Sequence, residues 1–371
     1  MNFEHLDMIL NQYIQNFDEL NAREGHDEGY KWRAVRCFQE QWNRDESAWE
    51  DGLAGKFKAA TKETENLVDN AWVQPNAGIL ALLKHKQEED FVRACFEELF
   101  CADNGDLNKR WDRIVAFMEK INDRLDHYGK PKTYRQTNNS VIYYLNLWRP
   151  EENYIFKATE VKSWAQCIEY GDDFGEGKSF SLDKYYRMCD ELLAELPKYE
   201  ELMHLHNERA AKEMQGYDDK LHILVYDIIY CAEHYGFYSR MHIEKVSATE
   251  RVRRAKIRDQ QKTLAQQIHE KEDQLKMLEV SKIALPDLTG FDVRHRVFGS
   301  GKVISCSDEK LTIDFAGSQK ILSHIDIIAK EILCFEDAAI VAQARLLAEV
   351  QAEEKKVRDE IKQLKGRLAT L

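Results

Sequence analysis

FDVRHRVFGSGKVISCSDEKLTIDFAGSQKILSHID, residues 291–326, has the clearest β character in a chain of 371 residues whose patterning is otherwise helical. Gly299 and Gly301 indicate a turn there, because glycine tolerates backbone conformations that other residues avoid. An alternation typical of a half-buried strand follows at Leu311, Ile313 and Phe315. We therefore predict four or five short strands that close into a small barrel, since closure removes unpaired strand edges.

The same stretch carries a recognisable arrangement of residues. His295 is followed by FGSGKV (298–303), by an Ile-x-Phe strand and by a lysine ahead of the last apolar pair. This arrangement, over about residues 288–334, resembles the Tudor-like barrels appended to superfamily-one helicases and some transcription factors. The resemblance implies a non-enzymatic module that binds a protein partner such as RNA polymerase, or nucleic acid. The partner-binding residues that it implies are His295, Phe298, Lys302 and Lys320. A structural cap without a ligand is the alternative.

Two segments with heptad spacing flank the predicted barrel. The first arm, within residues 246–285, has seam positions at Ile257, Leu264, Ile268, Leu275 and Leu278. The second arm, within residues 335–371, has them at Leu347, Val350, Val357, Ile361, Leu364, Leu368 and Leu371. Two imperfect seams joined by one compact insert predict an antiparallel coiled-coil hairpin with the barrel (286–334) at its tip. A homodimer through the C-terminal seam is the alternative.

Composition separates the rest of the chain from this region. The net charge is −13, and the first 245 residues account for all of the negative excess, while residues 246–371 are nearly balanced. All seven tryptophans also lie before residue 165. We therefore predict an acidic helical domain over residues 1–245, which as a whole is a poor binder of the phosphate backbone.

The location is predicted from what the sequence lacks. No apolar run approaches the ~20 residues of a membrane span, and the N-terminus lacks the pattern of a signal peptide. Eight scattered cysteines form no CxxC pair, which favours reduced thiols. These features predict a cytoplasmic protein without membrane contact, and no motif indicates a cofactor or a metal.

Several helical strings follow one another in the first domain. They are YKWRAVRCFQEQW (30–42), FVRACFEELF (91–100), NYIFKATEVKSWAQCI (153–168), LDKYYRMCDELL (182–193) and LVYDIIYCA (224–232). Over about residues 25–235 this succession resembles the helical region upstream of the motor in the modification-dependent restriction GTPase family and in other bacterial anti-phage proteins. No nucleotide-binding motor follows in this chain.

Residues 138–148 are compatible with helix or strand, and Tyr154–Lys157 with a strand.

The densest basic run opens the first heptad arm, at Arg251, Arg253, Arg254, Lys256 and Arg258. Phosphate binding to DNA is one interpretation of this run. A solvated helix face is the other, since Asp259 follows directly.

Three further patterns are weaker candidates for chemistry. Glu160 and Lys162 have the spacing of a metal-dependent nuclease site, but Thr159 predicts that they begin a helix instead. The string GDDFGEGKS (171–179) resembles a phosphate-binding loop, but it is one residue too long and a helix precedes it, so we interpret it as a surface loop. His204 and His206 are two residues apart, so on a helix they point to different faces, and this spacing does not indicate a zinc site.

The sequence thus predicts a mainly α protein with a small β insert, and it favours a non-enzymatic role over an enzyme. We expect a non-enzymatic accessory factor of bacterial nucleic-acid metabolism or anti-phage defence that docks a partner protein or DNA. The alternatives are a metal-dependent nuclease of a restriction-type system and a toxin or inhibitor that acts by sequestration.

Overall fold

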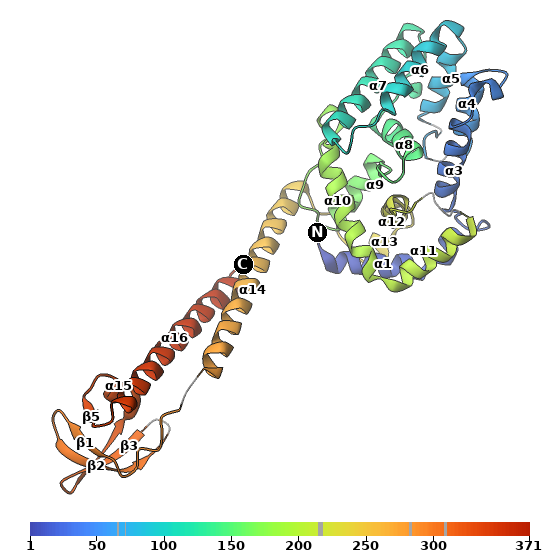
Figure 1. The fold of residues 1–371 in the computed structure, drawn as a ribbon. Helices are drawn as coiled ribbons and strands as arrows, with labels where there is room; N and C mark the ends of the chain where they lie inside the picture. The colour runs from blue at the N-terminus through green and yellow to red at the C-terminus, as the bar shows by residue number, and fades with distance from the viewer. Residues whose placement is uncertain (65–66, 71, 214–217, 282–283, 308–309) are drawn as a thin grey trace. The chain divides into compact units, whose positions relative to one another are not determined.

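The computed structural model divides into two compact units, Met1–Ala255 and Lys256–Leu371. It describes residues 1–64, 67–70, 72–213, 218–281, 284–307 and 310–371. The first unit is helical, and the second combines long helices with a small sheet (Figure 1). The prediction of a mainly helical chain with a small β insert is confirmed.

The first unit is built from helices joined by loops of varied length. Its helices are α1 (Phe3–Gln15), α2 (Phe17–Asn21), α3 (Tyr30–Trp42), α4 (Leu53–Ala60), α5 (Pro75–Leu83), α6 (Glu89–Leu99), α7 (Leu107–His127), α8 (Asn138–Trp148), α9 (Ala158–Cys167), α10 (Leu182–Glu195), α11 (Glu200–Glu213), α12 (His222–His234), α13 (Phe237–Arg240) and the start of α14 (Ala248–Val280). Short 3₁₀ helices occur at Glu46–Ala48, Lys86–Glu88, Lys132–Tyr134, Gly177–Ser179 and Leu196–Lys198.

Helices α8 and α12 form the centre of this unit. Every residue from Ser140 to Leu147 in α8 is buried, and so is every residue from Ile223 to Ile229 in α12. A helix that is buried on all sides has no polar face, so its sequence shows no helical period. This explains why residues 138–148 were compatible with either helix or strand.

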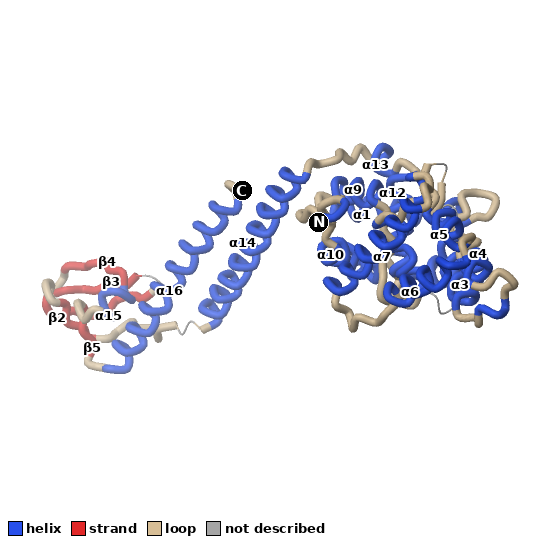
Figure 2. The backbone as a smooth tube through the Cα atoms, turned by 90° about the horizontal axis from the view of Figure 1, so that it is seen from above, coloured by secondary structure: helices blue, strands red, loops and turns tan. Residues whose placement is uncertain are grey.

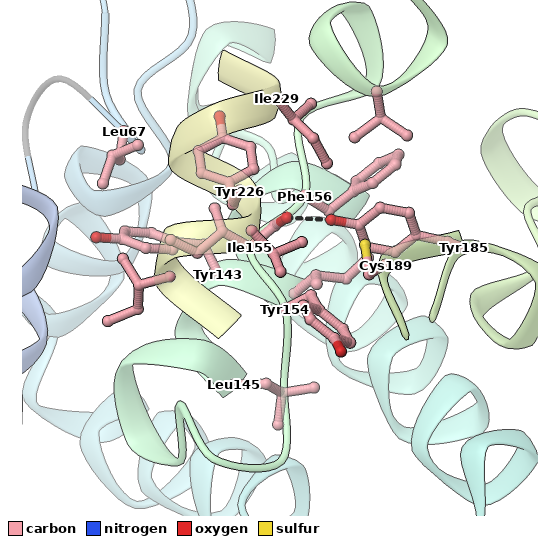
Figure 3. Packing of buried hydrophobic residues seen from close by; sticks show 14 of the residues in the cluster. Leu67, Tyr143, Leu145, Tyr154, Ile155, Phe156, Tyr185, Cys189, Tyr226 and Ile229 are labelled. Atoms are coloured by element: carbon pink, nitrogen blue, oxygen red, sulfur yellow. Dashed lines mark hydrogen bonds between the residues drawn. The ribbon is translucent and has the colours of Figure 1, made fainter. Parts of the chain in front are cut away.

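A buried extended segment, Tyr154–Phe156, crosses the core between α8 and α9 (Figure 3). The strand that the sequence favoured here is wrong, because no strand lies within the described residues of the first unit. Side chains bond the segment and the residue before it instead. The hydroxyl of Tyr185 donates to the carbonyl oxygen of Ile155, and Asn146 Nδ2 donates to the carbonyl oxygen of Asn153 at 2.7 Å. The segment leads directly into α9, so these bonds fix the start of that helix.

Helix α14 begins as part of the first unit. Arg251 is only 5% exposed and donates to the carbonyl oxygen of Tyr170 at 3.0 Å, while Arg254 pairs with Glu169 at 2.7 Å. These contacts hold the first two turns of α14 within the unit that ends at Ala255. The compact unit therefore extends about ten residues beyond the change in composition near residue 245.

The second unit contains one antiparallel sheet with the strand order β4-β3-β2-β1-β5 (Figure 2). The strands are β1 (Asp292–His295), β2 (Gly299–Cys306), β3 (Lys310–Phe315), β4 (Ser318–Ser323) and β5 (Leu333–Phe335). Helix α15 (His324–Ala329) connects β4 to β5, and α16 (Ala338–Leu368) follows. The register shifts between Val303 and Ser305, which marks a bulge in β2.

The predicted closed barrel is wrong, because the sheet is open, with β4 and β5 as its edges. Closure is not needed to bury the inner face, since α15 and α16 cover it. Ile328 of α15 and Ile340 and Ala344 of α16 share one apolar cluster with the inward residues of the strands. The short β5 and the helix ahead of it replace the last strand pairing that a barrel requires.

Gly301 is required by the packing of this sheet. A Cβ atom at this position would lie 2.5 Å from Cδ1 of Phe315 and 2.7 Å from the carbonyl oxygen of Asp314. We expect Gly301→Ala to destabilise the second unit by about 1–3 kcal/mol, because overpacking displaces the ring or the backbone. Amide hydrogen exchange of β2 and β3 measures this loss. Ser300→Ala, which changes the exposed neighbouring residue, is the control, and equal protection in both variants would contradict the prediction.

Helices α14 and α16 lie side by side and antiparallel in the second unit (Figures 1 and 2). Among the described residues, ion pairs join them at Lys271–Glu360, Glu272–Lys365 and Glu279–Arg358. Buried seam positions are Leu264, Ile268, Leu347, Val357 and Ile361. The C-terminal seam is buried at Leu347, Val357 and Ile361, whereas Leu371 at its end is exposed. Knobs-into-holes packing and a homodimer through α16 stay predictions.

Candidate functional site

An aromatic cluster of His295, Phe298, Phe315 and Lys320 lies at one end of the sheet. The ring centroids of His295 and Phe298 are 4.6 Å apart with an interplanar angle of 21°, so the two rings stack. The Phe298 ring is 5.4 Å from that of Phe315, and Nζ of Lys320 lies 5.8 Å from the Phe298 centroid. A lysine over an aromatic face is held by the negative potential of the ring.

The turn between β1 and β2 positions this cluster. Nδ1 of His295 accepts the backbone N–H groups of Val297 at 3.1 Å and Phe298 at 3.3 Å. These bonds fold the turn back over the imidazole, and Gly299, with a φ of +79°, reverses the chain into β2. The histidine therefore acts as the acceptor that fixes the loop, and it is itself buried.

Phe298, the outermost ring of the aromatic cluster, is partly exposed to solvent. Phe298 is 43% exposed and the adjacent Val297 is 78% exposed, whereas Phe315 is buried beneath them. The turn thus presents two apolar side chains above a buried, hydrogen-bonded base. Such preorganised apolar anchors are the residues that carry most of the binding energy in protein interfaces.

The structure separates the four residues that the sequence grouped together. Lys320 pairs with Ile313 in the sheet, on the face that carries Phe315. Lys302 pairs with Asp314 and therefore lies on the opposite face, where Asp292 is its other neighbour. Phe315 was missed as a member of the cluster. Its alternation with Ile313 indicated only a core position, and the contact with Phe298 depends on the register.

Part of the basic run forms bonds within the chain. Arg253 and Arg254 both donate to Glu250, at 2.7–2.9 Å, and these bonds lower the pKa of that glutamate to about 2. Arg251 is buried, and Arg258 is half-buried. Lys256 is exposed. The run is therefore not a continuous exposed row of five cations.

The two candidate nuclease residues lie in the first turns of α9. Nζ of Lys162 forms an ion pair with Glu176 at 2.7 Å, and Glu160 is half-buried near Tyr226 and Lys157. Within the described residues of the first unit there is no strand on which an acidic partner would lie. We expect the purified protein to leave plasmid DNA intact with magnesium or manganese. Degradation that disappears in Glu160→Gln would contradict this expectation.

A buried ion network, which the sequence did not reveal, ties α3 to α12. Nζ of Lys31 donates to Glu28 and, at 2.6 Å, to Asp227, and all three side chains are at most 3% exposed. The hydroxyl of Tyr13 also donates to Asp227. Lys31 lies in the apolar stripe of α3, and no spacing in the sequence marks it as buried.

The same network contains a group with the donor atoms of a metal site. Within the described part of the chain, Glu28, Asp227 and Cys231 lie close enough together to share an ion. The ammonium group of Lys31 already bonds both carboxylates, and nearby acids raise the pKa of this lysine well above its usual value, although burial alone would lower it. The network is therefore a structural ion cluster with its own cation.

Comparison with known proteins adds no relative. No family model, no curated protein and no solved structure matches the chain. In the part of the chain that the structure describes, no helix combines the length and the apolar character needed to cross a bilayer.

Proposed function

We propose that this chain is a non-enzymatic accessory factor of bacterial nucleic-acid metabolism or anti-phage defence that docks a partner protein. The observation that carries this proposal is the half-exposed aromatic cluster on the C-terminal sheet. The bacterial setting rests on the resemblance of residues 25–235 to the helical region of restriction GTPases. The docking role rests on the Tudor-like motif around His295.

The surface of the cluster favours a protein over DNA. Val297 and Phe298 are exposed apolar anchors, and the nearest exposed cations are Arg296 and Lys320. An apolar pocket with an acidic rim on the partner complements this arrangement. DNA binding instead needs an excess of positive charge, and residues 286–334 carry about as many acidic as basic side chains.

The test is capture of a partner from lysate of the native host on the immobilised full-length chain. The captured protein is then purified and its affinity is measured. We expect Phe298→Ala to weaken this affinity roughly 30-fold or more, the effect of losing a central anchor, and Lys320→Ala to weaken it less. Lys302→Ala, on the opposite face of the sheet, is the matched control and should bind as the unaltered chain does. Equal affinities for Phe298→Ala and Lys302→Ala would contradict the proposal.

DNA is the alternative ligand and has its own signature. Binding through the basic run would weaken steeply with salt, in proportion to the phosphates neutralised. Such binding would survive Phe298→Ala and would be lost when Arg253, Arg254 and Arg258 are reversed to Glu. We expect neither result. A toxin or inhibitor that acts by sequestration would use the same aromatic cluster, and the identity of the captured partner separates it from an accessory factor.

A further inference from the structure

A cleft of about 1420 Å³ opens in the first unit, far along the chain from the aromatic cluster. Its walls come from α7, α8, α9, the loop 173–178 and the start of α14. Small-ligand pockets typically measure roughly 300–1,000 Å³, so this cleft has room for a ligand with several functional groups.

Helices α8, α9 and α14 begin at this cleft, and so does α5. Their first residues, Asn138, Ala158, Ala248 and Pro75, all line it. Oδ1 of Asn139 accepts the N–H of Ala158 at 3.1 Å and so joins two of these N-termini. The side chains of Thr137 and Ser247 likewise accept one backbone N–H each at the starts of α8 and α14. The other first N–H groups of a helix have no acceptor within the helix and carry a positive partial charge, which favours anions.

A buried arginine provides a second, independent observation. Arg251 lines the cleft and is 5% exposed. Its Nη1 donates to the carbonyl oxygens of Tyr170 and Asp172, at 3.0 and 3.4 Å. In the described structure its buried Nε–H has no acceptor, which is costly for a charged group. The guanidinium that borders the cleft is therefore only partly satisfied by hydrogen bonds, and an anionic ligand would stabilise its charge.

Ion pairs neutralise part of the acidic lining. Lys162 pairs with Glu176 at 2.7 Å, and Lys178 pairs with Glu119 at 2.8 Å. Asp123 and Asp173 also border the cleft. The GDDFGEGKS loop thus contributes a wall, but its lysine bonds Glu119 of α7, so the loop does not cradle a phosphate in the manner of a P-loop.

The remaining wall is apolar. Phe156 and Phe180 have ring centroids 4.5 Å apart, and Val115, Met118 and Val161 lie on the same lining. A planar heterocycle packs well against aromatic and aliphatic side chains. We propose that the cleft binds a nucleoside phosphate, with its phosphates at the helix N-termini and Arg251 and its base on the apolar wall.

The test is calorimetric titration of the full-length chain, without divalent ions, with ATP, GTP, CTP and UTP in turn. Tripolyphosphate and adenosine serve as probes of the two halves of the ligand. We expect at least one triphosphate to bind with a Kd below about 1 mM, tripolyphosphate to compete with it, and adenosine to bind more weakly. The proposal fails if none of the four nucleotides binds, or if adenosine binds as well as ATP.

Two variants locate the binding in the cleft. Arg251→Met should weaken nucleotide binding roughly tenfold or more, as expected for the loss of charge-assisted hydrogen bonds. Because Arg251 also bonds the backbone, Lys157→Met, which changes a half-buried lining residue, provides the second variant and should weaken binding severalfold. Lys198→Met, an exposed lysine outside the cleft, is the matched control. Undiminished binding in the folded Lys157→Met variant would overturn the assignment.

Discussion

We expect Lys31→Met to lower the free energy of unfolding of the first unit by about 3–5 kcal/mol, the cost of leaving a buried ion pair without one partner. The ammonium of Lys31 bonds Glu28 and Asp227, and neither carboxylate has access to water. Methionine fills similar space but removes the cation that both carboxylates share, which leaves Asp227 with Arg209, 3.8 Å away, as its cation. Urea unfolding followed by tryptophan fluorescence measures the loss, and it reports on the first unit alone because all seven tryptophans lie there.

Two further variants separate charge from packing. Lys198→Met removes an exposed lysine whose partner is Glu195, and it should leave the unfolding curve unchanged. Lys31→Met combined with Glu28→Gln removes one charge of each sign and leaves Asp227 beside Arg209, 3.8 Å away, so it should recover part of the stability. A loss in Lys31→Met no larger than in Lys198→Met would show that the network does not stabilise the fold.

The amphipathic parts of this fold could be predicted from sequence, and the parts without a periodic pattern could not. In α3, Trp32, Val35 and Phe38 recur at helical spacing and all are buried. In α8 all sides are buried, so its sequence lacks the polar face that distinguishes a helix from a strand. The open sheet was mistaken for a barrel because short strands reveal their number but not how the two edges are covered.

In the candidate sites, too, contacts between residues close in sequence could be predicted, and contacts between distant segments could not. His295 and Phe298 are three residues apart, so their contact follows from one tight turn that the glycines indicated. Phe315 joins them through strand register, and the cleft is assembled from segments more than a hundred residues apart, such as Asn138 and Arg251. Arg251 was grouped with the other cations of the basic run because the sequence does not show that the start of α14 is packed against Tyr170.

Acid sensitivity of the first unit should depend on His206. This residue of α11 is 2% exposed, its Nδ1 lies 2.9 Å from Nη2 of Arg209, and its ring faces Trp32. Burial, together with the positive charge of Arg209, lowers the pKa of His206 from 6.5 to about 3. Below pH 6.5 the unfolded chain therefore binds a proton that the folded chain does not, so this histidine destabilises the fold as the pH falls towards 3.

We expect the unaltered chain to lose about 1.6 kcal/mol more stability than His206→Gln between pH 6.5 and pH 5.0, because the unfolded histidine is half protonated at pH 6.5 and the slope approaches 1.36 kcal/mol per pH unit only below it. Glutamine keeps a hydrogen-bond acceptor for Arg209 but does not titrate. The comparison must be a difference between variants, because Asp218 acts in the opposite sense: withdrawal of its carboxyl group from water raises its pKa to about 7, which favours the fold at lower pH. That contribution is common to both chains and cancels.

His204→Gln, exposed on the same helix, is the matched control and should follow the unaltered chain. Urea unfolding curves at pH 7.5, 6.5 and 5.0, read by tryptophan fluorescence, decide the matter. Parallel pH profiles for His206→Gln and the unaltered chain would mean that His206 is protonated without cost in the folded state.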